Sequence, residues 1–232
     1  MEKQDQEALK NFLLDINCLD ELQKWENHFN LFDVLKICRT EIRHSNVLSW
    51  LLNPNENHNL GDAFIKKVFQ EFIKNQPSAS KEVMQLLLMD FYSFSVYREW
   101  KNIDILIEVD KRWVIVIENK IFSDLNGKKE DEITQLDKYE RILTNENEYN
   151  AYNKIFVLLL PDHNNINIDN YTNWHKLFYS SVSSCLNEFV KNINDKQLEE
   201  FAEMVTRHSD KDYNYSVMKR RFERALIKAK KE

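Results

Sequence analysis

The stretch NIDILIEVDKRWVIVIENK, residues 102–120, decides the fold. Within it, residues 103–109 alternate between isoleucine or valine on one face and more polar side chains on the other, as a strand does. Residues 113–119 are apolar almost throughout until Glu118, which is typical of a strand that is covered on both faces. The two segments therefore predict an antiparallel hairpin at the centre of a sheet.

The length of the turn determines the register of this hairpin. If residues 110–112 form the turn, Val109 lies opposite Trp113, and Asp104 then falls opposite Glu118. Directly opposed residues have Cβ atoms about 4.5–5.5 Å apart, so two carboxylates there repel unless a cation lies between them. Hard oxygen ligands favour Mg²⁺. A two-residue turn would instead place the two carboxylates on opposite faces.

Composition excludes several classes of protein. The 232 residues fit one domain spanning 1–232, and the net charge of −6 argues against binding a polyanion through bulk charge. Only two glycines occur, so a glycine-rich phosphate loop is excluded. Three scattered cysteines form neither a disulfide framework nor a zinc site. With no secretory signal and no membrane-spanning run, we expect a cytoplasmic protein without membrane contact.

Further elements follow from hydrophobic periodicity. The predicted helices cover residues 6–26, 41 to a stop at 53–54, 60–75, a short segment ending near 88, 131–143, 184–192, 196–208 and a basic tail at 217–231. The predicted strands cover residues 91–100, 154–160 and 174–179 beside the central hairpin. Because a helix separates residue 120 from the strand at 154–160, that strand is expected to run parallel to the hairpin's second strand.

Two helix pairs add polar side chains to this framework. Glu41 and His44 are three residues apart, and Gln135 and Tyr139 are four apart, so each pair shares a helix face. Taken singly, each has a simpler interpretation: a solvated charge, a satisfied core histidine or a surface ion pair. Their order along the chain, together with the two hairpin carboxylates, favours a common site.

Four segments in this order resemble the PD-(D/E)XK nuclease superfamily, in particular a bacterial branch. The matching motifs are E-x-x-H-S at 41–45, I-D-I-L-I-E at 103–108, I-E-N-K-I at 117–121 and Q-L-x-x-Y at 135–139. The resemblance covers about residues 40–160. It implies an α/β fold with a restriction-endonuclease-like αβββαβ core, a mixed central sheet, and helical additions at 1–39 and 180–232.

The resemblance also implies a metal site. Asp104 and Glu118 would bind Mg²⁺, with Mn²⁺ as a substitute, and the Asn119 carbonyl would be a third ligand. Glu41 would contact the ion directly or through water. The cation lowers the pKa of a bound water and compensates the charge of the scissile phosphate.

The remaining motif residues have implied roles around the metal. Lys120 would orient the nucleophile or stabilise charge on phosphorus, and an ammonium beside two carboxylates favours the electrostatic role. Gln135 would position the water or a phosphate. His44 and Tyr139 would support these groups from behind.

The resulting hypothesis is a Mg²⁺-dependent endonuclease, a metal-dependent phosphodiesterase acting on DNA, with RNA left open as substrate. By family analogy it would be an anti-phage defence effector, gated by a partner protein or second messenger, and homodimers are considered because many nucleases of this fold pair to cut both strands. The alternative is a catalytically silent module that keeps the fold to bind nucleic acid or a protein partner. Metal binding discriminates between the two hypotheses.

Overall fold

The structure, a computed structural model, describes seven stretches of the chain: residues 31–34, 40–75, 80–88, 93–121, 134–164, 166–193 and 196–209. The helices predicted at 6–26 and 217–231 lie outside these stretches. Within them, no helix has the length and apolar character needed to cross a bilayer.

Residue contacts divide the chain into two compact units. One comprises residues 36–211, and the other joins 1–35 with 212–232. In the latter unit the structure describes only the short helix α3, Leu31–Val34. The single domain predicted from length remains a prediction, and the fold below is that of residues 36–211.

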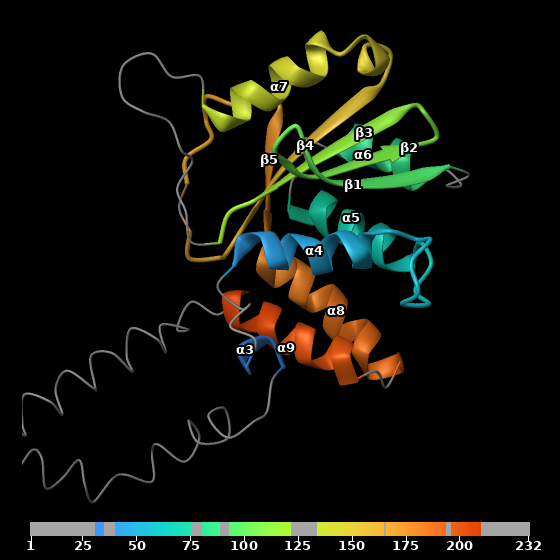
Figure 1. The fold of residues 1–232 in the computed structure, drawn as a ribbon, viewed down its shortest axis with the longest axis vertical. Helices are drawn as coiled ribbons and strands as arrows, with labels where there is room; N and C mark the ends of the chain where they lie inside the picture. Colours follow the sequence, from blue (N-terminus) through green and yellow to red (C-terminus); the bar gives the residue numbers. More distant parts are fainter. Residues whose placement is uncertain are drawn as a thin grey trace, which may run out of the picture. The chain divides into compact units, whose positions relative to one another are not determined.

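This unit is a five-stranded mixed sheet covered by helices (Figure 1). The helices are α4 Glu41–Leu52, α5 Ala63–Asn75, α6 Ser80–Leu87, α7 Gln135–Asn145, the 3₁₀ helix η3 Asn147–Tyr149, α8 Tyr179–Ile193 and α9 Lys196–Ser209. The strands are β1 Phe94–Trp100, β2 Ile103–Val109, β3 Trp113–Asn119, β4 Asn153–Leu160 and β5 Trp174–Phe178. The strands lie side by side in sequence order. The pairs β1/β2 and β2/β3 are antiparallel, and the pairs β3/β4 and β4/β5 are parallel. The predicted α/β class, mixed sheet and parallel β4 are confirmed.

The central hairpin has the register predicted from a three-residue turn. Val109 pairs with Trp113, and Ile105 pairs with Ile117. Asp110 and Lys111 both have positive φ, 51° and 52°, and the Arg112 amide donates to the Val109 carbonyl at 3.0 Å. Left-handed residues at a turn match the right-handed twist of the strands, which keeps the pairing in register.

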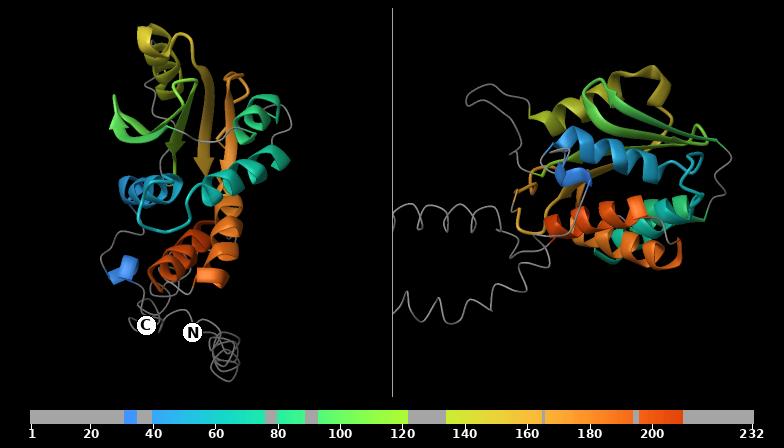
Figure 2. Two further views of the ribbon diagram at one scale, coloured as in Figure 1. Left: turned by 90° about the vertical axis from the view of Figure 1, so that its right-hand side faces the viewer. Right: turned by 60° about the horizontal axis from the view of Figure 1, so that its bottom comes forward.

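Helix α7 covers one face of the sheet, and α4, α5 and α8 lie on the other (Figures 1 and 2). The core on the α7 face joins helix and strand residues that include Leu106, Val116, Leu136, Leu143 and Leu158. Every residue of β3 is buried, as its continuous apolar pattern predicts for a strand with both faces covered.

Strand β1 departs from simple alternation. Its sequence predicts Arg98 and Trp100 on one face, and this is wrong. The Arg98 Nε donates to the Asn46 side chain of α4 at 3.0 Å, whereas Trp100 packs against the core on the α7 face. Glu99, between them, has φ +53°, and such an irregularity rotates the strand and reverses the alternation.

Helix α8 begins at Tyr179, upstream of the predicted start at residue 184. Its first turns contain several serines, which are weak helix formers, so local preference conceals the start. The Ser180 amide donates to the Asp162 carboxylate at 3.0 Å, and this contact satisfies one of the free amides at the helix start. The early start brings Tyr179 to the end of β3, where it contacts the site described next.

Candidate functional site

Three charged side chains gather on the α7 face where the central hairpin ends. The Asp104 carboxylate accepts a hydrogen bond from the Asn119 amide at 2.8 Å, which fixes it beside the last residues of β3. The Lys120 Nζ lies 2.7 Å from Glu118 Oε1, and these two side chains are only 7% and 1% exposed. The buried Lys120 ammonium is therefore paired with Glu118, and its charge also acts on Asp104.

Burial and like charge raise the proton affinity of both carboxylates. Burial raises the pKa of Glu118 to about 8, and the nearby charge of Asp104 adds to the rise, while Lys120 opposes it. Burial also raises the pKa of Asp104, against the hydrogen bond from Asn119 and the charge of Lys120. A single ammonium does not compensate the two negative charges.

Helix α7 presents Gln135 and Tyr139 to the same face. Thr134 and Asp137 form a capping box that starts α7 at Gln135, and the part of the predicted helix at residues 131–133 lies outside the described residues. The Gln135 Nε2 donates to the Tyr139 hydroxyl at 2.6 Å, and that hydroxyl donates to the Asn102 carbonyl. Burial raises the pKa of Tyr139, which keeps the phenol protonated at neutral pH.

Two buried acceptors on this face have no hydrogen-bond donor among the described residues. They are Glu118 Oε2 and Gln135 Oε1. The Tyr139 hydroxyl donates to the Asn102 carbonyl and also lies close enough to the Glu118 carboxylate to oppose the rise in its pKa. Buried acceptors left unpaired are costly and usually mark a place for a cation, water or ligand group. The donor set of carboxylate and amide oxygens suits a hard divalent cation.

Glu41, at the first turn of α4, reaches the end of β3 from the other side. Its Oε1 accepts a hydrogen bond from the Ile121 amide at 2.8 Å. In the parts of the chain that the structure describes, no group of three or more His, Cys, Asp or Glu side chains lies close enough to hold a metal ion. Glu41 is thus placed at the strand end but not within a ready-made three-carboxylate cluster.

The side chain of Asn119 belongs to a second cluster, on the α4 and α8 face. Its Oδ1 accepts from the Tyr179 hydroxyl at 2.8 Å, and its Nδ2 donates to Ser45 Oγ at 3.0 Å. All three residues are fully buried. His44, predicted near the metal site, is buried and lies edge-on to the Tyr179 ring, with centroids 6.3 Å apart.

Sequence reasoning missed the roles of Ser45 and Tyr179. Ser45 is part of the E-x-x-H-S motif, and a serine four residues after a candidate site residue was the only available signal. Nothing local marks Tyr179, which lies 60 positions after its partner Asn119.

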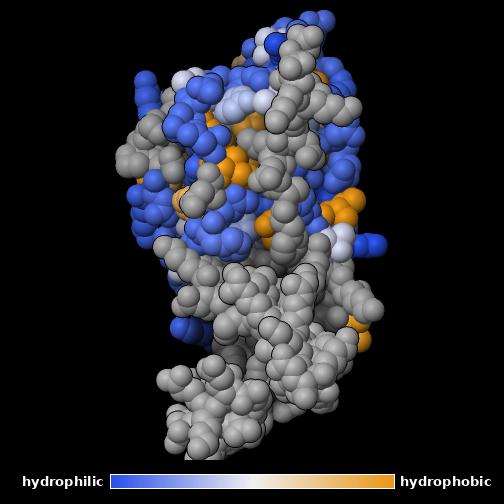
Figure 3. All heavy atoms as spheres, turned by 90° about the vertical axis from the view of Figure 1, so that its left-hand side faces the viewer, coloured by the Kyte–Doolittle hydropathy of each residue, from blue (hydrophilic) through white to orange (hydrophobic). Residues whose placement is uncertain are grey.

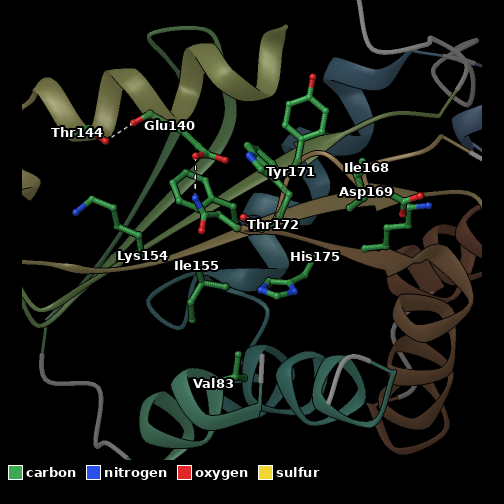
Figure 4. A pocket seen from close by; sticks show the side chains of 14 residues that line it. Val83, Glu140, Thr144, Lys154, Ile155, Ile168, Asp169, Tyr171, Thr172 and His175 are labelled. Atoms are coloured by element: carbon green, nitrogen blue, oxygen red, sulfur yellow. Dashed lines mark hydrogen bonds between the residues drawn. The ribbon is translucent and has the colours of Figure 1, made fainter. Parts of the chain in front are cut away.

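A separate cavity of about 760 Å³ lies against β4 and β5 (Figure 4). Its lining includes Val83, Glu140, Lys154, Tyr171 and His175 and none of the predicted site residues. The Asn173 side chain donates to Glu140 at 2.9 Å across it. Among the described residues on the face drawn in Figure 3, most are hydrophilic, and apolar side chains are visible between the polar ones. The predicted site residues therefore lie outside this cavity, at the end of the hairpin.

Comparison with known proteins gives one family. The family model for the PD-(D/E)XK nuclease superfamily matches residues 29–209, which contain all four motifs and every candidate site residue. Neither the curated proteins nor the solved structures gave a match to the chain.

Proposed function

The chain belongs to the PD-(D/E)XK nuclease superfamily, and from this membership and the hairpin site we propose that it is a Mg²⁺-dependent endonuclease that hydrolyses phosphodiester bonds of DNA. One observation carries the proposal. Asp104, which is half-buried, and Glu118, which is buried, are neighbouring carboxylates with raised pKa values, and the nearby Lys120 ammonium forms an ion pair with Glu118. Perturbed acids clustered in this way are typical of functional sites.

The residues present fit a divalent cation. Asp104, Glu118 and the Asn119 carbonyl would hold it, and Glu41 would join through water because the Ile121 amide occupies its Oε1. A bound Mg²⁺ supplies compensating positive charge and lowers the pKa of a coordinated water. The unpaired Glu118 Oε2 is the acceptor that such an ion would satisfy.

Lys120 and Gln135 would act on the phosphate and the attacking water. Lys120, whose Nζ lies 2.7 Å from Glu118, would stabilise charge developing on the phosphorus oxygens, and a cation held by Glu118 would supply the carboxylate's compensating charge in its place. Gln135 offers its unpaired Oε1 as an acceptor for a water proton while Tyr139 holds its Nε2. The surrounding protein holds the Lys120 and Gln135 side chains at the site before any substrate binds.

Plasmid cleavage tests the proposal. The full chain with Mg²⁺ should nick or cut supercoiled DNA, and Glu118→Ala or Lys120→Ala should abolish the cleavage. Lys67→Ala is a matched control, because Lys67 and Glu188 form another lysine–glutamate pair at 2.7 Å, far more exposed and outside the site. A parallel reaction with single-stranded RNA shows whether the substrate is DNA or RNA. Loss of cleavage in the Lys67 variant as well, or cleavage by the Glu118 variant, would contradict the assignment.

Metal binding separates this proposal from the silent-module alternative. Calorimetry should detect Mn²⁺ binding that disappears in Asp104→Ala. A folded protein that binds neither Mg²⁺ nor Mn²⁺ would favour the module that only binds nucleic acid or a partner. The anti-phage role is proposed by family analogy, and defence genes beside this one would support it.

A further inference from the structure

A buried chain of neutral hydrogen bonds runs from α8 to the first turn of α4. The Tyr179 hydroxyl donates to Asn119 Oδ1 at 2.8 Å, and Asn119 Nδ2 donates to Ser45 Oγ at 3.0 Å. The Ser45 hydroxyl in turn donates to the Glu41 carbonyl at 3.0 Å. The chain therefore ends on the backbone of Glu41.

Both polar atoms of the Asn119 side chain, Oδ1 and Nδ2, are hydrogen-bonded. Its Nδ2 also lies 3.4 Å from the Glu41 carbonyl, so the side chain contacts α4 twice and α8 once. Asn119, Ser45 and Tyr179 are each 0% exposed. A fully satisfied polar network in a dry core fixes the relative positions of the elements it joins, here β3, α4 and α8.

The network adjoins the charged site at two points. On β3, the Asn119 backbone N–H donates to the Asp104 carboxylate, so this hydrogen bond and the side-chain contacts together hold the Asn119 backbone in place. On α4, the Glu41 carboxylate reaches the Ile121 amide at 2.8 Å. Displacing the first turn of α4 would move that carboxylate away from the strand end.

We propose that Ser45 and Tyr179, acting through the Asn119 side chain, are positioning residues of the metal site. The network orients the Asn119 carbonyl and holds Glu41 over the end of β3, although Ser45 and Tyr179 touch neither metal nor substrate. The inference rests on the proposed metal site. Supporting groups behind metal ligands commonly change metal affinity by about 10- to 100-fold when removed.

Two substitutions in the full-length protein test it: Ser45→Ala and Tyr179→Phe. We expect each to weaken Mn²⁺ binding, measured by calorimetry, by about tenfold or more. In the metal-free protein, hydrogen exchange of the Ile121 amide should accelerate by about tenfold, because one hydrogen bond to Glu41 is weakened. Exchange of the Val116 amide, in the middle of β3, reports global opening and should follow only the change in thermal stability.

Matched controls remove hydroxyls elsewhere. Ser49→Ala deletes a serine hydroxyl from the same helix, which bonds only the Asn46 carbonyl at 2.8 Å, and Tyr152→Phe deletes the hydroxyl that donates to Glu108 at 3.1 Å. Both controls should bind Mn²⁺ as the unsubstituted protein does. Unchanged Mn²⁺ affinity in Ser45→Ala and Tyr179→Phe, or Ile121 exchange that rises no more than that of Val116, would overturn the inference. An unsubstituted protein that binds no Mn²⁺ would instead overturn the metal site itself, and the inference with it.

Discussion

At the end of β3, the two faces of the strand differ in charge and in how well their polar groups are hydrogen-bonded. Glu118 and Lys120 project toward α7, where carboxylates have raised pKa values and buried acceptors lack donors. Asn119, between them, projects toward α4 and α8, where its side-chain amide is fully hydrogen-bonded. Strand alternation alone separates the two environments by one residue.

The difference shows how one strand combines reactivity with rigidity. The charged face keeps groups that the fold leaves poorly compensated, which is costly but suits a site that awaits a cation. The neutral face supplies the stable support that such a site needs, because active-site groups hold their geometry only when packing and hydrogen bonds behind them are satisfied. The predictions below disturb one face at a time.

The largest expected effect follows Glu118→Gln, which keeps the shape of the side chain and removes its charge. Catalytic cleavage of plasmid DNA should fall on the order of a thousandfold or more, since a neutral amide neither retains the cation nor complements it. Initial rates at saturating Mg²⁺ measure the loss. Glu140→Gln, on the outer part of α7, is the control and should retain full activity. Near-normal cleavage by Glu118→Gln would remove Glu118 from the metal site.

The same substitution should change how the stability of the metal-free protein depends on pH. The pKa of Glu118 rises from 4.5 to about 8 on folding, so the folded state binds the proton more tightly. Stability is then highest below about pH 4.5, falls as pH rises toward 8, and is constant above that. The difference in unfolding free energy between pH 5 and pH 8 should be on the order of several kcal/mol.

Urea denaturation of both proteins in EDTA checks this prediction. In Glu118→Gln, the unfolding free energy should fall much less between pH 5 and pH 8. At pH 8 this variant should be more stable than the unsubstituted protein, because the amide carries no buried charge. Comparing the two proteins at each pH cancels the titration of groups that do not interact with Glu118. Parallel pH profiles for the two proteins would show that Glu118 titrates normally.

Much of the charged face could be predicted from sequence because it depends on local patterns. The three-residue turn sets the register, and the register places Asp104 beside the β3 carboxylate; the order of motifs then adds Glu41 and Gln135. The face on which each carboxylate lies needs only the two-residue period of a strand. The register and the face are short-range relations that the local sequence encodes, whereas Glu41, 80 residues from the Ile121 amide it accepts from, was placed by the order of the family's motifs.

The neutral face could not be predicted in this way. Asn119 meets Tyr179 from 60 residues away, and the tyrosine reaches it only because α8 begins earlier than its serine-rich start indicates. The reversal at Glu99 was equally invisible, since a positive φ at a glutamate has no sequence signature. Both features arise from tertiary packing, which overrides local preference.

A smaller effect is expected from disturbing the neutral face by Asn119→Ala. The Tyr179 hydroxyl would lose its Asn119 acceptor and the Ser45 hydroxyl its Asn119 donor, while Ser45 keeps its bond to the Glu41 carbonyl, so we expect a loss of about 1–3 kcal/mol. Because no charge is removed, the loss should be the same at pH 5 and pH 8, in contrast to Glu118→Gln. Urea denaturation at the two pH values measures it. A pH-dependent loss would show that the two faces are electrostatically coupled.

The smallest expected effect is that of Gln135→Leu, a neutral change on the charged face. Removing the unpaired Oε1 favours folding, whereas removing the hydrogen bond to Tyr139 opposes it. The two effects partly cancel, so the unfolding free energy should shift by no more than about 1 kcal/mol. Cleavage should fall about tenfold through loss of water positioning, while Mn²⁺ affinity stays unchanged because Gln135 is not a ligand. Gln85→Leu, on the exposed side of α6, is the control for an added apolar side chain. Weaker Mn²⁺ binding in Gln135→Leu would instead make Gln135 part of the metal's own shell, and would extend the charged face onto α7.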